Sequence, residues 1–547
     1  MNATELLAMY ERVADAPDAV ARLRRFVLDL AVRGKLVEQE DGSHDQLGRG
    51  SFARLATDRF FDVPDGWRWA RLSELGTLRG GGTPSKARPD FWDGAVPWVS
   101  PKDMKRDYLS SAQMTVTESA LAGSAANLIP AGSVLFVVRG MILAHSFPVG
   151  IATVPLTINQ DMKALVLAAP EIGEYLLRAL KGMKPFMLMR VQRSSHGTCR
   201  LEGADYSDFS VPIPPPAEQR RIVAKVDELM ALCDQLEAAR MERETARDRL
   251  AAASLARLNA PDPDTFQADA RFALEVLPAL SARPDQVKQL RQTILNLAVR
   301  GNLVPQEPRD ERAIDWLTRS CGGNRSRSAS SEGLLALPSS WAWIELGSLI
   351  STMDAGWSPQ CEDHPRRDIR SWGVLKTTAV QSLAFDCSQH KELPTKLAPR
   401  SQHEARVGDI LVTRAGPKHR VGVSCVVDAV EPRLMISDKL IRMRVLDGIA
   451  PRFIALCLNA GPTCSAIESA KSGMAVMQMN ISQEKLRAVP IPLAPLDEQH
   501  RIVVKVDELM ALCDQLECSI AVGESTRSGL LDALLQEALE LSATVAA

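Results

Sequence analysis

The sequence lacks long apolar runs: no stretch approaches the ~20 consecutive apolar residues that cross a membrane. Its ten cysteines show no Cys-x-x-Cys pairing. The N-terminus, with Glu5, Glu11 and Asp15, lacks the basic-then-apolar layout of a secretory signal. We therefore expect no membrane-spanning segment, free thiols and a reducing, cytoplasmic location.

Motifs for common catalytic chemistry are also missing. There is no Asp/Asn-Pro-Pro-aromatic motif of amino-methyltransferases, no Gly-Lys-Ser/Thr phosphate loop, no His-Glu-x-x-His and no Gly-x-Ser-x-Gly. Gly80-Gly81-Gly82 lacks the following Lys-Ser/Thr and is better explained as a turn than as a phosphate cradle. Lys102-Asp103 and Asp438-Lys439 are more typical of surface ion pairs than of a nuclease centre. We therefore predict no catalytic residue, no metal site and no cofactor in this chain.

An excess of charge of one sign is absent as well. The chain has 65 Lys and Arg against 67 Asp and Glu, a net charge of -2. Residues 60–210 carry 16 basic against 14 acidic side chains, and residues 336–488 carry 19 against 15, which leaves -8 for the remainder. These small excesses are consistent with compositional noise. Alternatively, nucleic acid binds the two segments and protein partners bind the rest.

The sequence does contain a large internal repeat. Residues 218–237 return as residues 498–517 with 18 of 20 positions identical, and residues 21–40 return as residues 288–307 with 12 of 20 identical. A Val-Pro/Leu-Pro pair with two tryptophans also recurs, at Trp67 and Trp69 and at Trp341 and Trp343. The offsets of 280, 267 and 274 residues indicate one duplication of about half the chain. The regions between these blocks share little, so one scaffold presents two different globular domains.

Each copy contains a long predicted helix. Residues 217–260 have no glycine or proline and follow a proline-rich turn, which predicts a helix of about 60 Å. Its apolar residues step by four and three, the pattern of a coiled-coil seam. Such a helix can act as a spacer between two heads on DNA, whereas the alternative is a helix packed on its own domain. The partner-helix seam comprises Ile222, Val226, Leu229, Cys233, Leu236, Ile502, Val506, Leu509, Cys513 and Leu516, continued by Ile520.

The remaining elements complete an α+β protein. Residues 23–32 and 290–299 are predicted as helices ended by Gly34 and Gly301. Short apolar runs predict strands at residues 133–138, 151–154, 164–167, 409–412, 421–427 and 440–445, and helices at residues 174–181 and 451–459. Loops are predicted at residues 42–50, 259–264 and 322–328.

We divide the chain accordingly. The parts are an N-terminal helical region (1–59), a first globular domain (60–214), a long helix (215–260), a linker with a helical repeat (261–335), a second globular domain (336–492) and a C-terminal long helix (493–547). The two helical regions are expected to form an antiparallel coiled coil with internal pseudo-twofold symmetry.

The order of these parts resembles a known family. Pro-Pro-x-Glu-Gln at residues 215–219 and Pro-Leu-Asp-Glu-Gln at residues 495–499, each followed by Arg-Ile-Val and a long helix, are similar to the HsdS specificity subunits of type I restriction-modification systems. So are Gly-Thr-Pro-Ser-Lys at residues 82–86, the Trp-x-Gly-x-Val-Pro-Trp motif at residues 92–98 and Ile-Asn-Gln-Asp at residues 158–161. The second copy departs from this pattern, with Ala-Gly-Trp-Ser-Pro-Gln at residues 355–360, so the motif alone does not locate its loop.

The resemblance implies a non-catalytic subunit for phage defence. Its two target-recognition domains would bind a bipartite, asymmetric target in double-stranded DNA, and its helices would dock two methyltransferase (M) subunits, with restriction (R) subunits in the complex. S-adenosylmethionine, ATP and Mg²⁺ are then expected on those partners. A coiled-coil scaffold that does not bind DNA is the alternative, but it leaves two large, divergent domains unexplained.

We expect each globular domain to contact bases and phosphates from its loops. The DNA-binding candidates are Thr83, Ser85, Lys86, Lys102, Lys105, Arg106, Arg139, Arg193 and Ser194 in the first domain, and Trp357, Ser358, Gln360, Lys376, Arg414, Lys418, Arg420 and Lys439 in the second.

Overall fold

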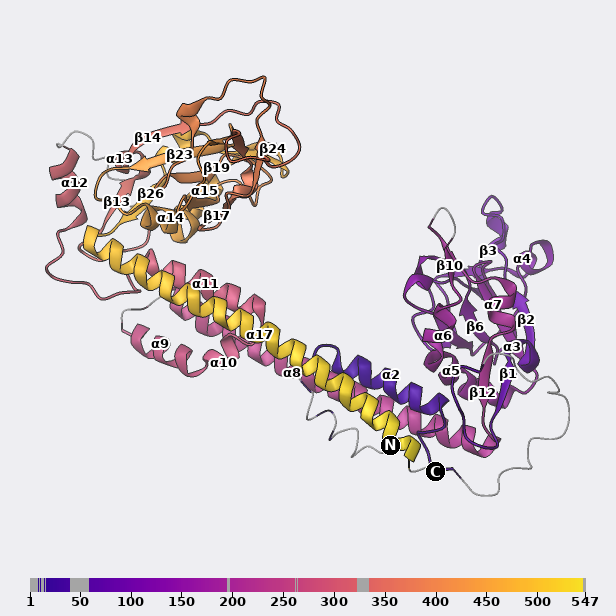
Figure 1. Cartoon of the computed structure of the whole chain (residues 1–547). Coiled ribbons are helices and arrows are strands. Elements are labelled where there is room, and N and C mark those ends of the chain that lie inside the picture. Colours follow the sequence, from indigo (N-terminus) through magenta and orange to yellow (C-terminus); the bar gives the residue numbers. More distant parts are fainter. Residues whose placement is uncertain are drawn as a thin grey trace. The chain divides into compact units, whose positions relative to one another are not determined.

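The computed structural model describes residues 8, 10, 14, 16–39, 59–193, 197–260, 262, 264–321 and 334–544. Its contacts divide the chain into two compact units: unit 1 is Met1–Arg243 with Gly523–Ala547, and unit 2 is Glu244–Val522. Each unit contains one sheet-rich domain and part of each of two long helices (Figure 1). The predicted α+β fold is confirmed. The loops predicted at residues 42–50 and 322–328 lie outside the described residues.

The two long helices are α8 (Pro216–Asn259) and α17 (Leu496–Thr544). Each begins directly after a proline, a residue that fits the first turn but not the interior of a helix. The adjacent glutamine fixes the entry, because the Nε2 atoms of Gln219 and Gln499 donate to the carbonyls of Pro214 and Ala494, both at 2.9 Å. The long helix predicted over residues 217–260 is confirmed, and the Glu-Gln repeat has a structural cause.

Unit 1 is built around a five-stranded sheet of order β2-β9-β6-β7-β4. A three-stranded sheet β5-β3-β8, the pair β1-β12 and the hairpin β10-β11 accompany it. The strands are β1 (Arg68–Arg71), β2 (Gly76–Gly80), β3 (Trp92–Val99), β4 (Tyr108–Leu109), β5 (Met114–Val116), β6 (Val134–Val137), β7 (Val149–Ala152), β8 (Thr157–Ile158), β9 (Met162–Leu167), β10 (Gln192–Arg193), β11 (Cys199–Arg200) and β12 (Ser210–Ile213).

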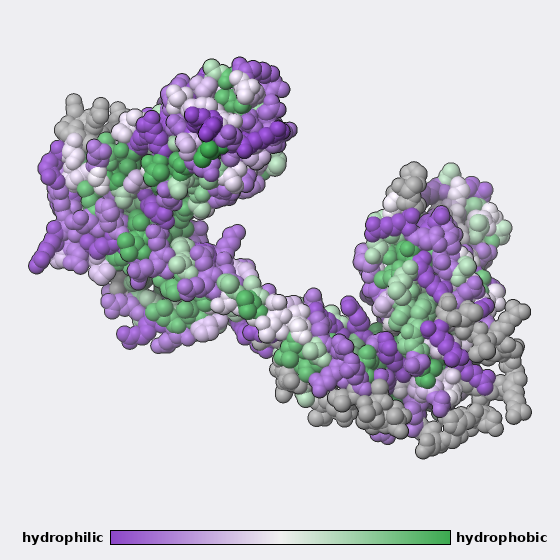
Figure 2. Space-filling model, in the orientation of Figure 1, coloured by the Kyte–Doolittle hydropathy of each residue, from purple (hydrophilic) through white to green (hydrophobic). Residues whose placement is uncertain are grey.

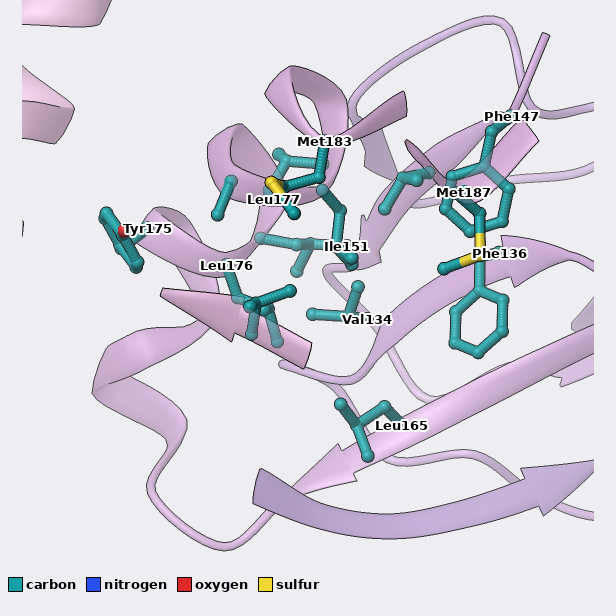
Figure 3. Packing of buried hydrophobic residues seen from close by; sticks show 14 of the residues in the cluster. Val134, Phe136, Phe147, Ile151, Leu165, Tyr175, Leu176, Leu177, Met183 and Met187 are labelled. Carbon is teal, nitrogen blue, oxygen red and sulfur yellow. The ribbon is translucent and has the colours of Figure 1, made fainter. Parts of the chain in front are cut away.

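Short helices join these strands, and one of them, α5, covers the central sheet. Figure 3 shows Val134 and Ile151 of the sheet facing Leu176 and Leu177 of α5 in the buried core. Burial of this face stabilises the domain by roughly 25 cal/mol per Å² of apolar surface. The helices are α2 (Ala19–Val32), α3 (Leu72–Leu75), α4 (Glu118–Gly123), α5 (Gly173–Gly182), α6 (Lys184–Leu188) and α7 (Gly203–Ser207).

Unit 2 has the sheet β14-β23-β19-β21 and a smaller sheet β18-β15-β22, with the pairs β13-β26 and β16-β17 and the sheet β20-β25-β24. The strands are β13 (Ala342–Glu345), β14 (Ile350–Ala355), β15 (Gly373–Leu375), β16 (Val380–Gln381), β17 (Ala384–Phe385), β18 (His390–Glu392), β19 (Ile410–Thr413), β20 (Ala415–Gly416), β21 (Ser424–Val426), β22 (Leu434–Ile436), β23 (Leu440–Val445), β24 (Ser472–Ala475), β25 (Gln478–Asn480) and β26 (Pro490–Leu493).

Six helices of unit 2 were not predicted from the sequence patterns: α9, α10, α12, α13, α15 and α16. The first three occupy the region assigned to a linker and a helical repeat. Ala273 of α9 and Leu280 of α10 pack on the end of α8, whereas Trp316 and Leu317 of α12 pack in the core of the second globular domain. The helices are α9 (Phe266–Glu275), α10 (Leu277–Leu280), α11 (Pro284–Ala298), α12 (Ala313–Cys321), α13 (Leu346–Leu349), α14 (Pro451–Asn459), α15 (Gly461–Ala470) and α16 (Gln483–Arg487).

Equivalent short helices pack against the long helices in the two units. In unit 1, Arg24 of α2 forms ion pairs of 2.6 Å with both Asp234 and Glu237 of α8. In unit 2, Arg291 of α11 pairs in the same way with Asp514 at 2.5 Å and with Glu517 at 3.1 Å on α17. The internal repeat is therefore a repeat of contacts as well as of sequence.

The C-terminal part of α17 completes unit 1. Ala19 of α2 is buried against Leu531 of α17, and Arg22 pairs with Asp532 at 3.1 Å. The Nζ of Lys35 donates to the carbonyl of Leu539 at 2.7 Å. The helix α2 thus packs on both long helices.

The apolar seam is used within the chain. Ile222, Val226, Leu229 and Cys233 are buried in the unit 1 core beside residues of α2 and of the sheet-rich domain, and Leu236 is half-buried at its margin. In unit 2, Ile502 and Val506 join the domain core, while Leu509, Cys513, Leu516 and Ile520 pack against α11. The interpretation of these residues as a seam awaiting a partner is therefore incomplete, because the chain's own short helix and globular domain cover it.

A buried glutamate ties each long helix to its domain. In unit 1 the Glu218 carboxylate accepts hydrogen bonds from Trp67 Nε1 at 3.0 Å and Gln39 Nε2 at 2.7 Å. In unit 2 Glu498 accepts the equivalent bonds from Trp341 at 2.9 Å and Gln306 at 2.6 Å. Burial raises the pKa of both carboxyl groups. We call each trio a glutamate clamp.

No helix of the described residues is both long and apolar enough to cross a membrane. The nine cysteines whose side chains the structure describes are all free thiols. Several are deeply buried, and burial raises the pKa of Cys425 to about 12. Such thiols behave as small apolar groups.

Candidate nucleic-acid interface

One edge of the five-stranded sheet in unit 1 collects the loops that carry the predicted contacts. Gly80 pairs with Lys163, and Val137 pairs with Met162, in antiparallel register. The end of β2, the end of β6 and the start of β9 therefore lie at the same edge. We call this edge and its loops the reading edge of unit 1.

Backbone hydrogen bonds lock these loops together. The N–H of Gly82, after β2, donates to the carbonyl of Ile158 at 3.0 Å. The N–H of Arg139, after β6, donates to the carbonyl of Asp161 at 3.1 Å. The loop conformations are therefore fixed by the backbone, and the side chains of Thr83, Ser85 and Arg139 in these loops are exposed.

Unit 2 repeats this arrangement with a different sequence. The N–H of Trp357, after β14, donates to the carbonyl of Ile436 at 3.1 Å. The N–H of Arg414, after β19, donates to the carbonyl of Lys439 at 2.7 Å. The loop at residues 355–360 thus occupies the position of residues 80–85, although the two motifs differ. We call this edge the reading edge of unit 2.

In each unit a glycine lets the loop after β2 or β14 pass close to the backbone of the strand β8 or β22. A Cβ atom on Gly81 would lie 2.0 Å from the carbonyl oxygen of Ile158, and one on Gly356 would lie 1.9 Å from that of Ile436. Neither distance is tolerable for a side chain. The interpretation of Gly80-Gly81-Gly82 as a turn is wrong in detail: the segment is not a turn, and its glycines allow close approach to a neighbouring backbone.

The equivalent side chains at the two edges differ. The hydroxyl of Thr83 is hydrogen-bonded to the Gln160 amide oxygen in unit 1, and the hydroxyl of Ser358 to the Asp438 carboxylate in unit 2. Gln160 and Asp438 are additional candidates for base contacts. Each precedes the first residue of a strand by two positions; the sequence motifs at residues 158–161 and 438–439 include them, but they were not among the predicted DNA contacts. An amide in one unit and a carboxylate in the other present different hydrogen-bonding groups to a base.

A hairpin extends each edge. Arg139 forms a bridge with Arg200 of β11, so the β10-β11 hairpin, which carries Arg193, adjoins the loop after β6. In unit 2, Ala415 of β20 pairs with Asn480 of β25, which attaches the β24-β25 hairpin at the equivalent place.

The other predicted residues follow strands that end at the same edges. Lys102, Lys105 and Arg106 lie between β3, which runs parallel to β8, and β4, which runs parallel to β7. Lys376 directly follows β15, which runs parallel to β22. The structure therefore brings the described candidates of each domain to one edge of that domain.

Exposure separates the candidates into two groups. Exposed side chains are Thr83, Ser85, Lys86, Lys102, Lys105, Arg106, Arg139, Arg193, Ser358, Gln360, Lys418 and Lys439. Half-buried side chains are Trp357, Lys376, Arg414 and Arg420. Ser194 lies outside the described residues.

Two of the half-buried candidates have internal partners. The Trp357 indole packs with Val374, Leu393 and Met435 on the small sheet. The guanidinium of Arg420 donates to the carbonyls of Thr377 at 2.7 Å and Val380 at 2.6 Å, and to the side chain of Gln381 at 3.0 Å. These two side chains support the edge through internal contacts, and their role as direct DNA contacts stays a prediction.

A second candidate surface lies on the long helices. Glu228, Ala231 and Gln235 of α8 are exposed on one helical face, as are their identical counterparts Glu508, Ala511 and Gln515 of α17. On α17 this face adjoins the exposed Val504 and a surface hollow of about 340 Å³. Figure 2 shows hydrophobic and hydrophilic residues mixed along the long helices. We call these six residues the repeated helical face.

No group of histidine, cysteine or carboxylate side chains that could hold a metal ion occurs within the described residues. The hydroxyl, amide and basic groups of the reading edges are suited to hydrogen bonding with bases and to neutralising phosphates.

The family model and the similar proteins found by comparison all point to the same family. Residues 64–243 match the type I restriction modification DNA specificity domain. The chain is 33% identical to the EcoEI specificity subunit of Escherichia coli, over 95% of this chain and 94% of that protein. It is 23% identical to the EcoAI specificity subunit of Escherichia coli, over 95% and 94% of the two chains.

A solved structure shares the fold. It comes from work on complex assembly and conformational transition of the type I restriction-modification system. It aligns with a TM-score of 0.50 and 20% identity, over 87% of this chain and 98% of that chain. Taken with the near full-length match to a curated relative, the repeated fold and the two reading edges, these findings show that the chain belongs to the family of type I restriction-modification DNA-specificity subunits.

Proposed function

We propose that each reading edge binds one half of a bipartite, asymmetric target in double-stranded DNA. As a specificity subunit, the chain is itself non-catalytic and serves DNA target recognition. One observation supports two different half-sites: the two reading edges have the same backbone hydrogen bonds but carry different side chains. Thr83 with Gln160 and Ser358 with Asp438 occupy matching positions with different hydrogen-bonding groups.

The charges at the edges suit phosphate contacts. Lys86 and Arg139 are exposed in unit 1, and Lys439 is exposed in unit 2. Basic side chains of this kind hold the duplex and set its register, whereas the shorter polar side chains read base edges. In this proposal, the exposed basic side chains at the edges attract phosphates locally, although the chain has a net charge of -2.

We further propose that the repeated helical face binds two M subunits, with R subunits joining the complex. Glu228, Ala231 and Gln235 lie outside the buried seam, so packing within the chain does not require their identity with Glu508, Ala511 and Gln515. Two copies of one partner account for two identical faces. The methyl donor, ATP and Mg²⁺ reside on the M and R subunits. Such a complex acts in the cytoplasm, where it meets invading phage DNA.

The test of DNA binding is electrophoretic mobility of the chain, assembled with M subunits, on duplexes that carry or lack the target. Replacing Lys86 and Arg139 by glutamine should weaken binding to both duplexes and lower the salt slope by about 0.9 per lost phosphate contact. Arg406 provides the matched control, because it is exposed and precedes β19 at the sheet edge opposite to Arg414. Arg406→Gln should leave binding unchanged.

A scaffold that does not bind DNA remains the competing function. It predicts no mobility shift on any duplex at any salt concentration and no dependence of the genomic methylation motif on this gene. Mapping methylated adenines in the host with and without the gene distinguishes the two functions. Loss of a split motif on deletion supports DNA reading, and an unchanged pattern of methylation contradicts it.

A further inference from the structure

An exposed arginine at the reading edge of unit 2 is held in place by an aromatic ring. The guanidinium carbon of Arg400 lies 4.3 Å from the centroid of the Trp357 ring. A guanidinium stacked on an indole gains cation–π energy and loses rotamer freedom before any ligand arrives. The backbone is anchored too, since the N–H of Arg400 donates to the sulfur of Met435 at 3.3 Å.

The position of Arg400 at the reading edge follows from its contact with Trp357. The backbone N–H of Trp357 donates to the carbonyl of Ile436, the last residue of β22. The hydroxyl of the next residue, Ser358, donates to the Asp438 carboxylate. Arg400 therefore lies beside the loop of residues 356–360, against the same strand that ends at the reading edge of unit 2.

The polar edge of this guanidinium has no acceptor among the described residues. Arg420, in contrast, is occupied by the Thr377 and Val380 carbonyls, and Arg442 by the Asp354 carboxylate at 2.9 and 2.6 Å. Stacking uses the face of a guanidinium and leaves its in-plane N–H donors for another partner.

In unit 1, an arginine that lies over an aromatic ring has its donors bonded to a neighbouring carboxylate. Arg88 stacks on Phe91 with its guanidinium carbon 4.4 Å from the ring centroid. Its donors are already used, because Nε and Nη2 bond both oxygens of Asp90 at 2.8 and 2.6 Å. Arg400 thus differs from Arg88 in having no acceptor for its donors among the described residues, although both guanidinium groups lie over an aromatic ring.

We propose that Arg400 reads a guanine in the half-site bound by unit 2, with Trp357 as its positioning residue. This inference rests on the proposed DNA-reading function. A planar pair of N–H donors matches the O6 and N7 acceptors of guanine in the major groove, whereas other bases do not present two acceptors in that geometry. The stacked orientation supplies the rigidity that bidentate recognition requires.

The experiment maps the methylated motif of complexes assembled with variants of the full chain. Arg400→Gln should keep the first half-site and the gap unchanged and reduce the preference for G·C at one position of the second half-site by about tenfold to a hundredfold. Arg400→Lys should lose most of the same preference, because an ammonium makes no bidentate contact. Arg406→Gln is the control with an intact motif.

Trp357→Leu tests the positioning role, since leucine fills apolar space but cannot stack. It should reduce the preference at the same base pair as Arg400→Gln, and the double variant should lose no more than either single variant. If Arg400→Gln leaves every position of the motif intact, or weakens binding equally for all sequences, the proposal is overturned. A wild-type complex with no split motif would instead refute the proposed function.

Discussion

The glutamate clamps show how single residues join a helix to a domain in this chain. Glu218 and Glu498 are each held by a tryptophan and a glutamine from segments far away in the sequence. Removal of the carboxylate leaves two buried donors unsatisfied, which costs more than the hydrogen bonds themselves contribute.

We therefore expect Glu218→Ala to destabilise unit 1 by roughly 1–3 kcal/mol. Urea unfolding followed by tryptophan fluorescence, to which Trp67 contributes, measures this. Glu228→Ala, an exposed change ten residues further along α8, is the control and should alter the unfolding free energy by less than about 0.5 kcal/mol. Equal effects of the two variants would show that the clamp has no special role.

The clamps also predict a pH dependence. Burial raises the folded-state pKa of Glu218 and Glu498 above the ordinary value of 4.5. Their contribution to stability is fully present below the unfolded-state pKa and is lost as the pH rises through the folded-state pKa. The unfolding free energy of the wild type minus that of Glu218→Ala/Glu498→Ala should therefore decrease as the pH rises from about 4.5. A difference that grows with pH would contradict the direction of the shift.

At the scale of elements, sequence patterns predicted what depends on local composition. The helices at residues 217–260 and 451–459 and the strand at residues 440–445 follow from runs of suitable residues and appear as α8, α14 and β23. Helices α9, α10 and α12 were missed, because they are short and become stable only by packing on other elements.

The candidate site was predictable in part. The basic and polar candidates stand out in the sequence because they follow predicted strands, although ordinary surface loops have the same composition. Their grouping at one edge depends on strand register, which pairs Gly80 with Lys163, and no local pattern contains that information. The same limitation hid the internal roles of Trp357 and Arg420, whose partners come from other strands.

The lengths of α8 and α17 predict the gap between half-sites. Both helices supply residues to unit 1 and unit 2, so four residues inserted after Arg243 and four after Val522 add about 6 Å of rise to each. We expect the unread gap to lengthen by one or two base pairs while both half-sites are unchanged. Motif mapping measures this, and a matched insertion after Ala260 in the loop before α9 is the control. An assembled complex that still methylates the original gap length refutes the prediction.

The whole molecule has two equivalent helical faces, which predicts its stoichiometry. We expect native mass spectrometry to find one chain with two M subunits at saturation, and the isolated chain to transfer no labelled methyl group to DNA. Replacing Ala231 by arginine should leave a complex with one M subunit, because the intact face around Ala511 still binds. A stable one-to-one complex of the wild type would contradict this.

The packing of the C-terminal part of α17 on α2 makes the order of synthesis matter. Ala19 and Leu531 share one buried cluster although more than five hundred residues separate them. While the ribosome is still translating the second half, the first domain has no cover for that side of α2 and exposes apolar surface to chaperones and proteases. A premature stop codon after Val522 would consequently harm the domain that was made first, and the intact second domain would give no sign of the damage.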